Sequence, residues 1–178
     1  FQAGVQYVVY NLIGSSLFLF ALGTIYAVTG TLNMADLAVR VAELPASDTA
    51  ILRVGAIMLL LVFAIQAALL PLHFWLPASY ATAPLPVAAL FAIMTKVGAY
   101  SILRVYTLVF APDVPAAAGL MESWLLPAAL MTAAIGAIGL LGSRGLGRLG
   151  AVGAVRSVGP PLSAISLCTN GTATAATR

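Results

Sequence analysis

Charged residues are scarce in this sequence. Only 7% of its 178 residues are Asp, Glu, Lys or Arg, whereas 62% are hydrophobic. A soluble domain of this size carries about a quarter charged residues, and it could not bury so much apolar surface. We therefore expect an all-α polytopic membrane protein. The net charge of +3 does not indicate nucleic-acid binding, because the arginines lie at segment ends and form no basic patch interleaved with aromatic residues.

Residues that could build a metal site or the active site of a soluble enzyme are equally rare. The sequence has one cysteine, Cys168, and one histidine, His73. One cysteine cannot form an internal disulfide, and a metal site needs several His, Cys or carboxylate ligands at suitable spacing. We therefore expect no metal, no cofactor and no active site of a soluble enzyme.

The N-terminus shows no targeting signal. Phe1 is not an initiator methionine, and neither a basic region nor a small-residue cleavage site follows it. We expect the chain to begin within a longer protein.

Most of the chain consists of apolar runs long enough to cross a bilayer, which takes about 20 helical residues. They cover about residues 5–28, 50–76, 85–110 and 123–141. A short apolar run after Arg156, interrupted by Pro160 and Pro161, predicts an incomplete fifth span. The sequence thus predicts a transmembrane unit over residues 1–150 and a diverged or truncated tail over residues 151–178.

The segment between the first two spans predicts a short amphipathic helix. Asn33 is a typical N-cap residue, with Asp36 three positions later. Apolar residues then recur at helical spacing up to Pro45. We expect this helix to lie in the membrane interface with its charges solvated.

Small residues in two of the spans predict helix-packing faces, because they let backbones approach closely. One group is Asn11, Gly14, Ser15 and Ser16, and the other is Ala129, Ala133, Gly136 and Gly139.

The second span should contain a helix break. Pro71 has no N–H and clashes with the carbonyl four residues earlier, so the carbonyl of Ala67 loses its partner. In hydrocarbon such a carbonyl is tolerated only where protein or a cavity satisfies it. Gln66 and His73 flank the break, which predicts a small polar cluster.

Lys96 lies in the middle of the third span. It is about 11 residues, or roughly 16 Å, from the start of that helix, near the centre of a core about 30 Å thick. Gln66 lies at a similar depth, so we expect the two side chains to be neighbours. Desolvation disfavours a charged lysine. Lys96 is therefore either a proton carrier or a static counter-charge to an acid on another helix.

Arginines indicate the orientation of the chain. Arg144, Arg148 and Arg156 form its densest positive cluster, which the positive-inside rule places in the cytoplasm together with the proline-rich corner at residues 77–86. Trp75, beside that corner, predicts with Tyr80 an aromatic belt at the membrane surface.

Three segments resemble a known family. Residues 30–38 (GTLNMADLA), 67–91 (AALLPLHFWLPASYATAPLPVAALF) and 95–104 (TKVGAYSILR) are similar to proton-translocating antiporter-like membrane subunits. That family includes the D-type subunit of the multisubunit Mrp-type cation/proton antiporters and the large membrane-arm subunits of respiratory complex I. The first segment is more similar to the Mrp D-type subunit, and the resemblance covers roughly residues 1–150.

The resemblance implies a multi-pass protein of the bacterial plasma (inner) membrane, with inverted repeats that each contain a broken helix. It also implies two lysines that pass protons along a polar axis, and a glutamate partner that lies outside this sequence. Lys96 matches the second lysine, and His73 is a possible relay neighbour. Gln66 stands where the family has the first lysine, and a glutamine cannot release a proton.

The function that the resemblance implies is proton translocation coupled to antiport of a monovalent cation such as Na⁺. Other subunits of a membrane complex, the lipid bilayer, protons and cations are the expected partners. Two alternatives stay open. The chain could belong to a complex I-type or hydrogenase-type proton-pumping subunit, or it could be a non-transporting scaffold or inactive fragment.

Overall fold

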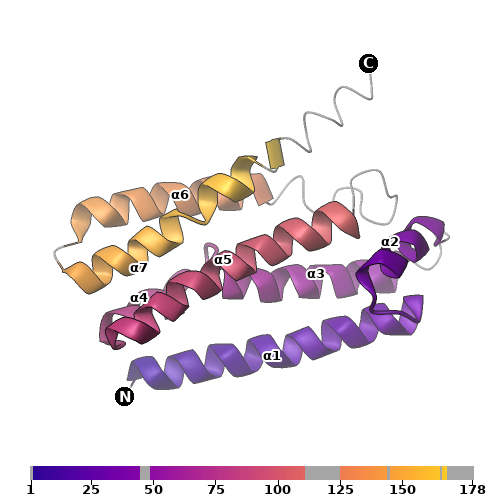
Figure 1. Cartoon of the computed structure of the whole chain (residues 1–178), viewed down its shortest axis with the longest axis horizontal. Coiled ribbons are helices and arrows are strands. Elements are labelled where there is room, and N and C mark those ends of the chain that lie inside the picture. Colours follow the sequence, from indigo (N-terminus) through magenta and orange to yellow (C-terminus); the bar gives the residue numbers. More distant parts are fainter. Residues whose placement is uncertain (1, 45–48, 111–124, 144, 165, 168–178) are drawn as a thin grey trace.

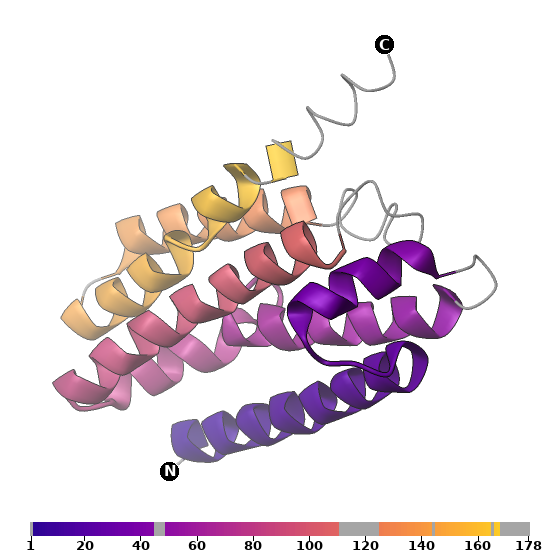
Figure 2. The same cartoon turned by 45° about the vertical axis from the view of Figure 1, so that its right-hand side comes forward.

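The chain is helical throughout the regions that can be described. The computed structural model describes residues 2–44, 49–110, 125–143, 145–164 and 166–167. The helices are α1 (Gln2–Thr29), α2 (Met34–Glu43), α3 (Thr49–Gln66), α4 (Trp75–Thr82), α5 (Leu85–Leu108), α6 (Leu125–Gly142) and α7 (Leu146–Arg156), with a 3₁₀ turn, η1 (Leu72–Phe74), before α4. The long helices run side by side along one axis (Figures 1 and 2).

The arrangement is that of a membrane helix bundle. Gly4–Thr29, Pro86–Leu108 and Leu125–Gly142 are long and apolar enough to cross a membrane, and Ala50–Gln66 is a shorter apolar helix. The expected all-α membrane architecture is therefore confirmed. The α4–α5 corner and the α6–α7 turn lie at one end of the bundle, and α2 lies at the other (Figure 1).

The break in the second span lies at Gln66. The amide of Leu69 donates to the carbonyl of Ala64 at 2.9 Å, and Ala68 has a φ of +54°. This left-handed residue with its long-range amide bond is a Schellman motif, which ends an α-helix. The first residue outside α3 is Ala67, whose carbonyl Pro71 is predicted to leave without a helical partner, so the break next to Gln66 lies where the sequence predicts it. Instead of one run over residues 50–76, the chain forms α3, η1 and then α4.

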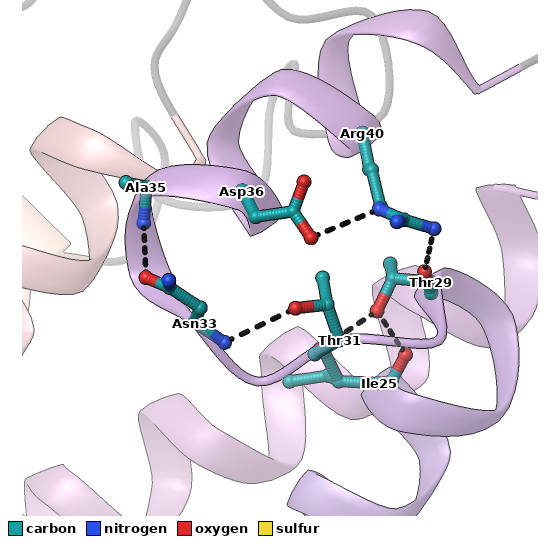
Figure 3. A network of polar contacts seen from close by, with 7 residues as sticks. All are labelled: Ile25, Thr29, Thr31, Asn33, Ala35, Asp36 and Arg40. Carbon is teal, nitrogen blue, oxygen red and sulfur yellow. Dashed lines mark hydrogen bonds and ion pairs between the residues drawn. The ribbon is translucent and has the colours of Figure 1, made fainter.

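A polar network docks α2 onto the end of α1 (Figure 3). Arg40 donates from Nε to Asp36 at 3.1 Å and from Nη1 to the carbonyl of Thr29 at 3.0 Å. Gly30, with a φ of +70°, ends α1 at this point. Carbonyls at the end of a helix lack intrahelical partners and favour a cation nearby, so Arg40 satisfies α1 while it holds α2.

The expected amphipathic helix is confirmed in α2. The side chain of Asn33 accepts from the amide of Ala35 at 3.2 Å and caps the helix. Leu37 and Val41, on its apolar stripe, are buried with exposed fractions of 7% and 1%.

We predict that Arg40→Gln lowers the free energy of unfolding by about 1 kcal/mol, because the end of α1 loses its cation. Thermal unfolding of the purified protein in detergent measures this as a lower Tm. Glu43→Gln on the same helix is the matched control and should leave Tm unchanged. Equal Tm values for the two variants would show that Arg40 does not hold α2.

The two groups of small residues behave differently. Gly136 and Gly139 of α6 do pack against α7, where a Cβ would lie 2.7 Å from the Cα of Arg156 and 2.8 Å from Cγ1 of Val152, respectively. In α1, by contrast, a Cβ on Gly14 would meet nothing within 4 Å. The prediction of a packing face at Asn11–Ser16 is thus wrong for the described part of the chain.

Candidate functional site

Gln66 and Lys96, which the sequence predicts to be neighbours, lie on different sides of α5. A Cβ on Gly98 would lie 2.6 Å from the amide nitrogen of Ala67 and 3.0 Å from the carbonyl carbon of Gln66. Lys96 donates instead from Nζ to Oγ of Ser157, just after α7. Residues two apart on a helix point about 200° apart. Gln66 and Lys96 therefore lie at a similar depth, but their side chains meet different elements.

Lys96 is exposed within the described part of the chain. Its ammonium group reaches Ser157, whose hydroxyl donates to the carbonyl of Ala154 at 2.7 Å. Lys96 lies midway along α5, a helix long and apolar enough to span a membrane. Since lysines at such depth face a bundle interior or a cavity, the α5–α7 contact forms a polar position in the membrane.

Gln66 borders a cavity of about 430 Å³ between α1 and the helix break. Polar and apolar side chains line it together, among them Tyr10, Asn11, Ser15, Phe18, Phe63 and Gln66. A water molecule occupies about 30 Å³ in the liquid, so the cavity has room for several waters or a hydrated cation. The polar residues of α1 that we expected to pack against a helix therefore line the approach to Gln66.

Trp75 stabilises the broken helix from within. Its Nε1 donates to the carbonyl of Ile65 at 2.9 Å, and only 4% of its surface is exposed. Its ring lies 5.9 Å from that of Tyr7 and 6.3 Å from that of Phe91. The predicted aromatic belt is therefore wrong for Trp75. The ring of Tyr80 packs against α7, where it would lie 2.9 Å from a Cβ on Gly150, and for this residue the belt stays a prediction.

Thr132 of α6 completes the break, and sequence reasoning missed it. The amide of Leu70 donates to Oγ1 of Thr132 at 3.1 Å, and this fully buried hydroxyl donates to the carbonyl of Ala128 at 2.6 Å. Irregular backbone at membrane depth needs such a protein partner. The sequence feature that could have indicated this role is that Thr132 carries the one hydroxyl group of the otherwise apolar segment Leu125–Gly142.

His73 lies in η1, which packs against α3. Its Nδ1 is buried and has no hydrogen-bond partner among the described residues, and its ring lies 4.5 Å from that of Phe74. His73 therefore lies at the helix break, whereas Lys96 lies at the contact between α5 and α7. Among the described residues, no group of three or more His, Cys, Asp or Glu could hold a metal ion.

Arg156, the last residue of α7, packs against the middle of α6. Its Cα would be 2.7 Å from a Cβ on Gly136, which is well inside α6. Residues 146–156 form α7, which runs antiparallel to α6 (Figure 1). The prediction of a cytoplasmic Arg156 is therefore wrong.

Comparison with known proteins identifies the family. Residues 1–177 match the family described as NADH:quinone oxidoreductase/Mrp antiporter, transmembrane. The chain belongs to this family. Together with the apolar helices, membership makes the chain a multi-pass part of a plasma-membrane protein.

Curated relatives confirm the resemblance to the Mrp D-type subunit. The chain is 42% identical over 135 residues to the D-type subunit of the probable K⁺/H⁺ antiporter of Rhizobium meliloti, with 76% of this chain and 25% of that protein covered. It is 43% identical over 137 residues to the D-type subunit of the Na⁺/H⁺ antiporter of Bacillus subtilis, with 76% and 27% covered. The chain thus spans about a quarter of the length of these relatives.

Two solved structures share the fold. A chain of the archaeal membrane-bound sulfane sulfur reductase, a respiratory membrane complex, matches with a TM-score of 0.81 and 31% identity, over 93% of this chain and 33% of that chain. The Mrp complex of Dietzia sp. matches with a TM-score of 0.76 and 30% identity, over 93% and 29%.

Proposed function

We propose that the protein containing this chain exchanges a monovalent cation such as Na⁺ for protons, as the D-type subunit of a multisubunit antiporter. The observation that carries this proposal is the contact of Lys96 with Ser157 midway along a membrane helix. The relatives named as K⁺/H⁺ and Na⁺/H⁺ antiporter subunits support the choice of substrates.

Lys96 carries the proton in this proposal. The neutral amine of Lys96 takes up a proton, and the resulting ammonium donates a hydrogen bond to the Ser157 hydroxyl until it releases that proton again. An amine can lose its proton when it is removed from water, whereas a guanidinium cannot. The family resemblance, rather than the geometry alone, assigns this relay role to Lys96.

The helix break between α3 and α4 would be the second position at which protons are exchanged. Gln66 borders the cavity and forms hydrogen bonds without carrying a proton. His73 is then the titratable group of the break, and its Nδ1 has no protein partner among the described residues. We propose that His73 exchanges protons at the break and that Gln66 only orders the cavity.

Gln66→Lys in the intact protein is expected to raise cation-dependent proton exchange by about tenfold or more, because it adds a titratable group. Gln66 is the last residue of α3, and the end of a helix favours a cation, so the lysine should be tolerated. Dequenching of a pH-sensitive dye in everted vesicles, on addition of Na⁺, measures the exchange.

Gln66→Met is the matched control, because it keeps the length of the side chain without a polar group. It should not raise exchange. If Gln66→Lys exchanges no faster than Gln66→Met, the break does not need a titratable group at this position.

A redox-driven proton pump is the second candidate. The TM-score of 0.81 to a chain of a respiratory complex favours it. The two functions differ in their driving force. An antiporter moves cations under an imposed pH gradient alone, whereas a redox-driven pump moves protons only while an electron donor is oxidised. Vesicles without an electron donor therefore discriminate between them.

A further inference from the structure

The side chain of Arg156 is exposed at the level of the membrane interior. Two independent contacts set this depth. Its backbone packs against Gly136, about 16 Å from the start of α6, and the next residue, Ser157, accepts from Lys96 midway along α5. Both helices are long and apolar enough to cross a membrane. Arg156 is therefore a charge in the bilayer interior.

The surface around Arg156 is apolar. Leu149, seven residues earlier and on the same face of α7, is exposed to 46%. Ile135, adjacent to Gly136 in α6, is exposed to 41%. A guanidinium stays charged under all physiological conditions, and in a membrane such a charge pairs or faces a polar cavity.

Among the described residues, no acid lies at that depth. The five acidic residues of the chain all lie outside α1, α3, α5, α6 and α7. Among the described residues the acids are Asp36 and Glu43 on α2, and Asp36 is already paired with Arg40. The described residues therefore supply no counter-charge for Arg156.

We propose that Arg156 pairs with an Asp or Glu on a transmembrane helix of the longer protein, and that this helix covers the α6–α7 face. Charge complementarity requires the acid. The relatives support the longer protein as the source of this helix. The chain covers only about a quarter of their length, so most of such a protein lies outside this sequence. The pairing goes beyond the proposed function and applies equally to an antiporter and to a redox pump.

Photocrosslinking in membranes tests the proposal without any need for transport. A p-benzoylphenylalanine at Leu149 of the full-length protein keeps Arg156 intact and lies seven residues away on the same helix face. We expect adducts to a peptide of the same protein that carries an Asp or Glu at mid-membrane depth. Lipid adducts alone, adducts to another subunit, no protein adduct, or a helix without an acid would each overturn the proposal.

A double-variant cycle then tests the pair itself. Arg156→Gln and the change of the crosslinked acid to Gln or Asn should each lower the amount of folded protein in the membrane severalfold, because each leaves one charge unpaired. The double variant should recover most of the wild-type amount, and Arg156→Lys should retain it. A double variant that is no better than the single ones means that the two groups do not interact.

Discussion

Lys96→Ala in the intact protein is expected to lower proton-coupled cation exchange about a hundredfold or more. A positioned proton carrier contributes roughly 10²- to 10⁴-fold to a proton transfer, and alanine cannot carry a proton. The side chain is exposed and its described partner is the hydroxyl of Ser157. The substitution should therefore leave the fold intact. Exchange is measured in everted vesicles, with the amount of protein in the membrane determined in parallel.

Lys96→Arg separates the two roles that the sequence leaves open. Arginine keeps the positive charge and can still donate to Ser157, but it cannot release a proton. A proton relay is lost in this variant as in Lys96→Ala, whereas a static counter-charge is retained. Exchange near the wild-type rate in Lys96→Arg would exclude the relay.

Gly98→Ala is expected to lower the free energy of unfolding by about 2 kcal/mol, although alanine usually stabilises a helix by about 1 kcal/mol relative to glycine. The added Cβ would lie 2.6 Å from the amide nitrogen of Ala67, which belongs to the turn that ends α3. Because the obstacle is backbone, no side-chain rotation relieves it, and overpacking of this kind costs about 1–3 kcal/mol. Denaturation of the purified protein in mixed micelles measures the loss.

Gly23→Ala is the matched control for this prediction. A Cβ at Gly23 of α1 would meet nothing within 4 Å, so the same chemical change should leave stability unchanged or slightly higher. A Gly98→Ala protein as stable as Gly23→Ala would show that α5 and the helix break can separate without loss.

Particular residues show how far the sequence leads. The N-cap at Asn33 and the stripe with Leu37 and Val41 predicted α2 correctly, because capping and helical periodicity are local properties. The similar depths of Gln66 and Lys96 also followed, since each residue of a helix adds 1.5 Å along its axis. Depth does not specify which neighbour a side chain meets.

The conformation of the helix break illustrates a second limit. Pro71 predicts that the helix ends near Ala67, and α3 does end at Gln66, but the sequence does not predict that Ala68 takes a left-handed conformation. Alanine gives no local signal for that conformation. The bonds from Trp75 to Ile65 and from Leu70 to Thr132 hold the break in place, and they join residues up to 62 positions apart.

Scarce charge and long apolar runs determined by themselves that this is a helical membrane protein, because only a bilayer accommodates such a composition. The tertiary structure decided that Lys96 meets Ser157 and that Arg156 lies beside Gly136. It also decided that Gln66 borders a cavity. Such pairings depend on how helices rotate and pack against one another, and the order of residues along a single helix does not contain that information.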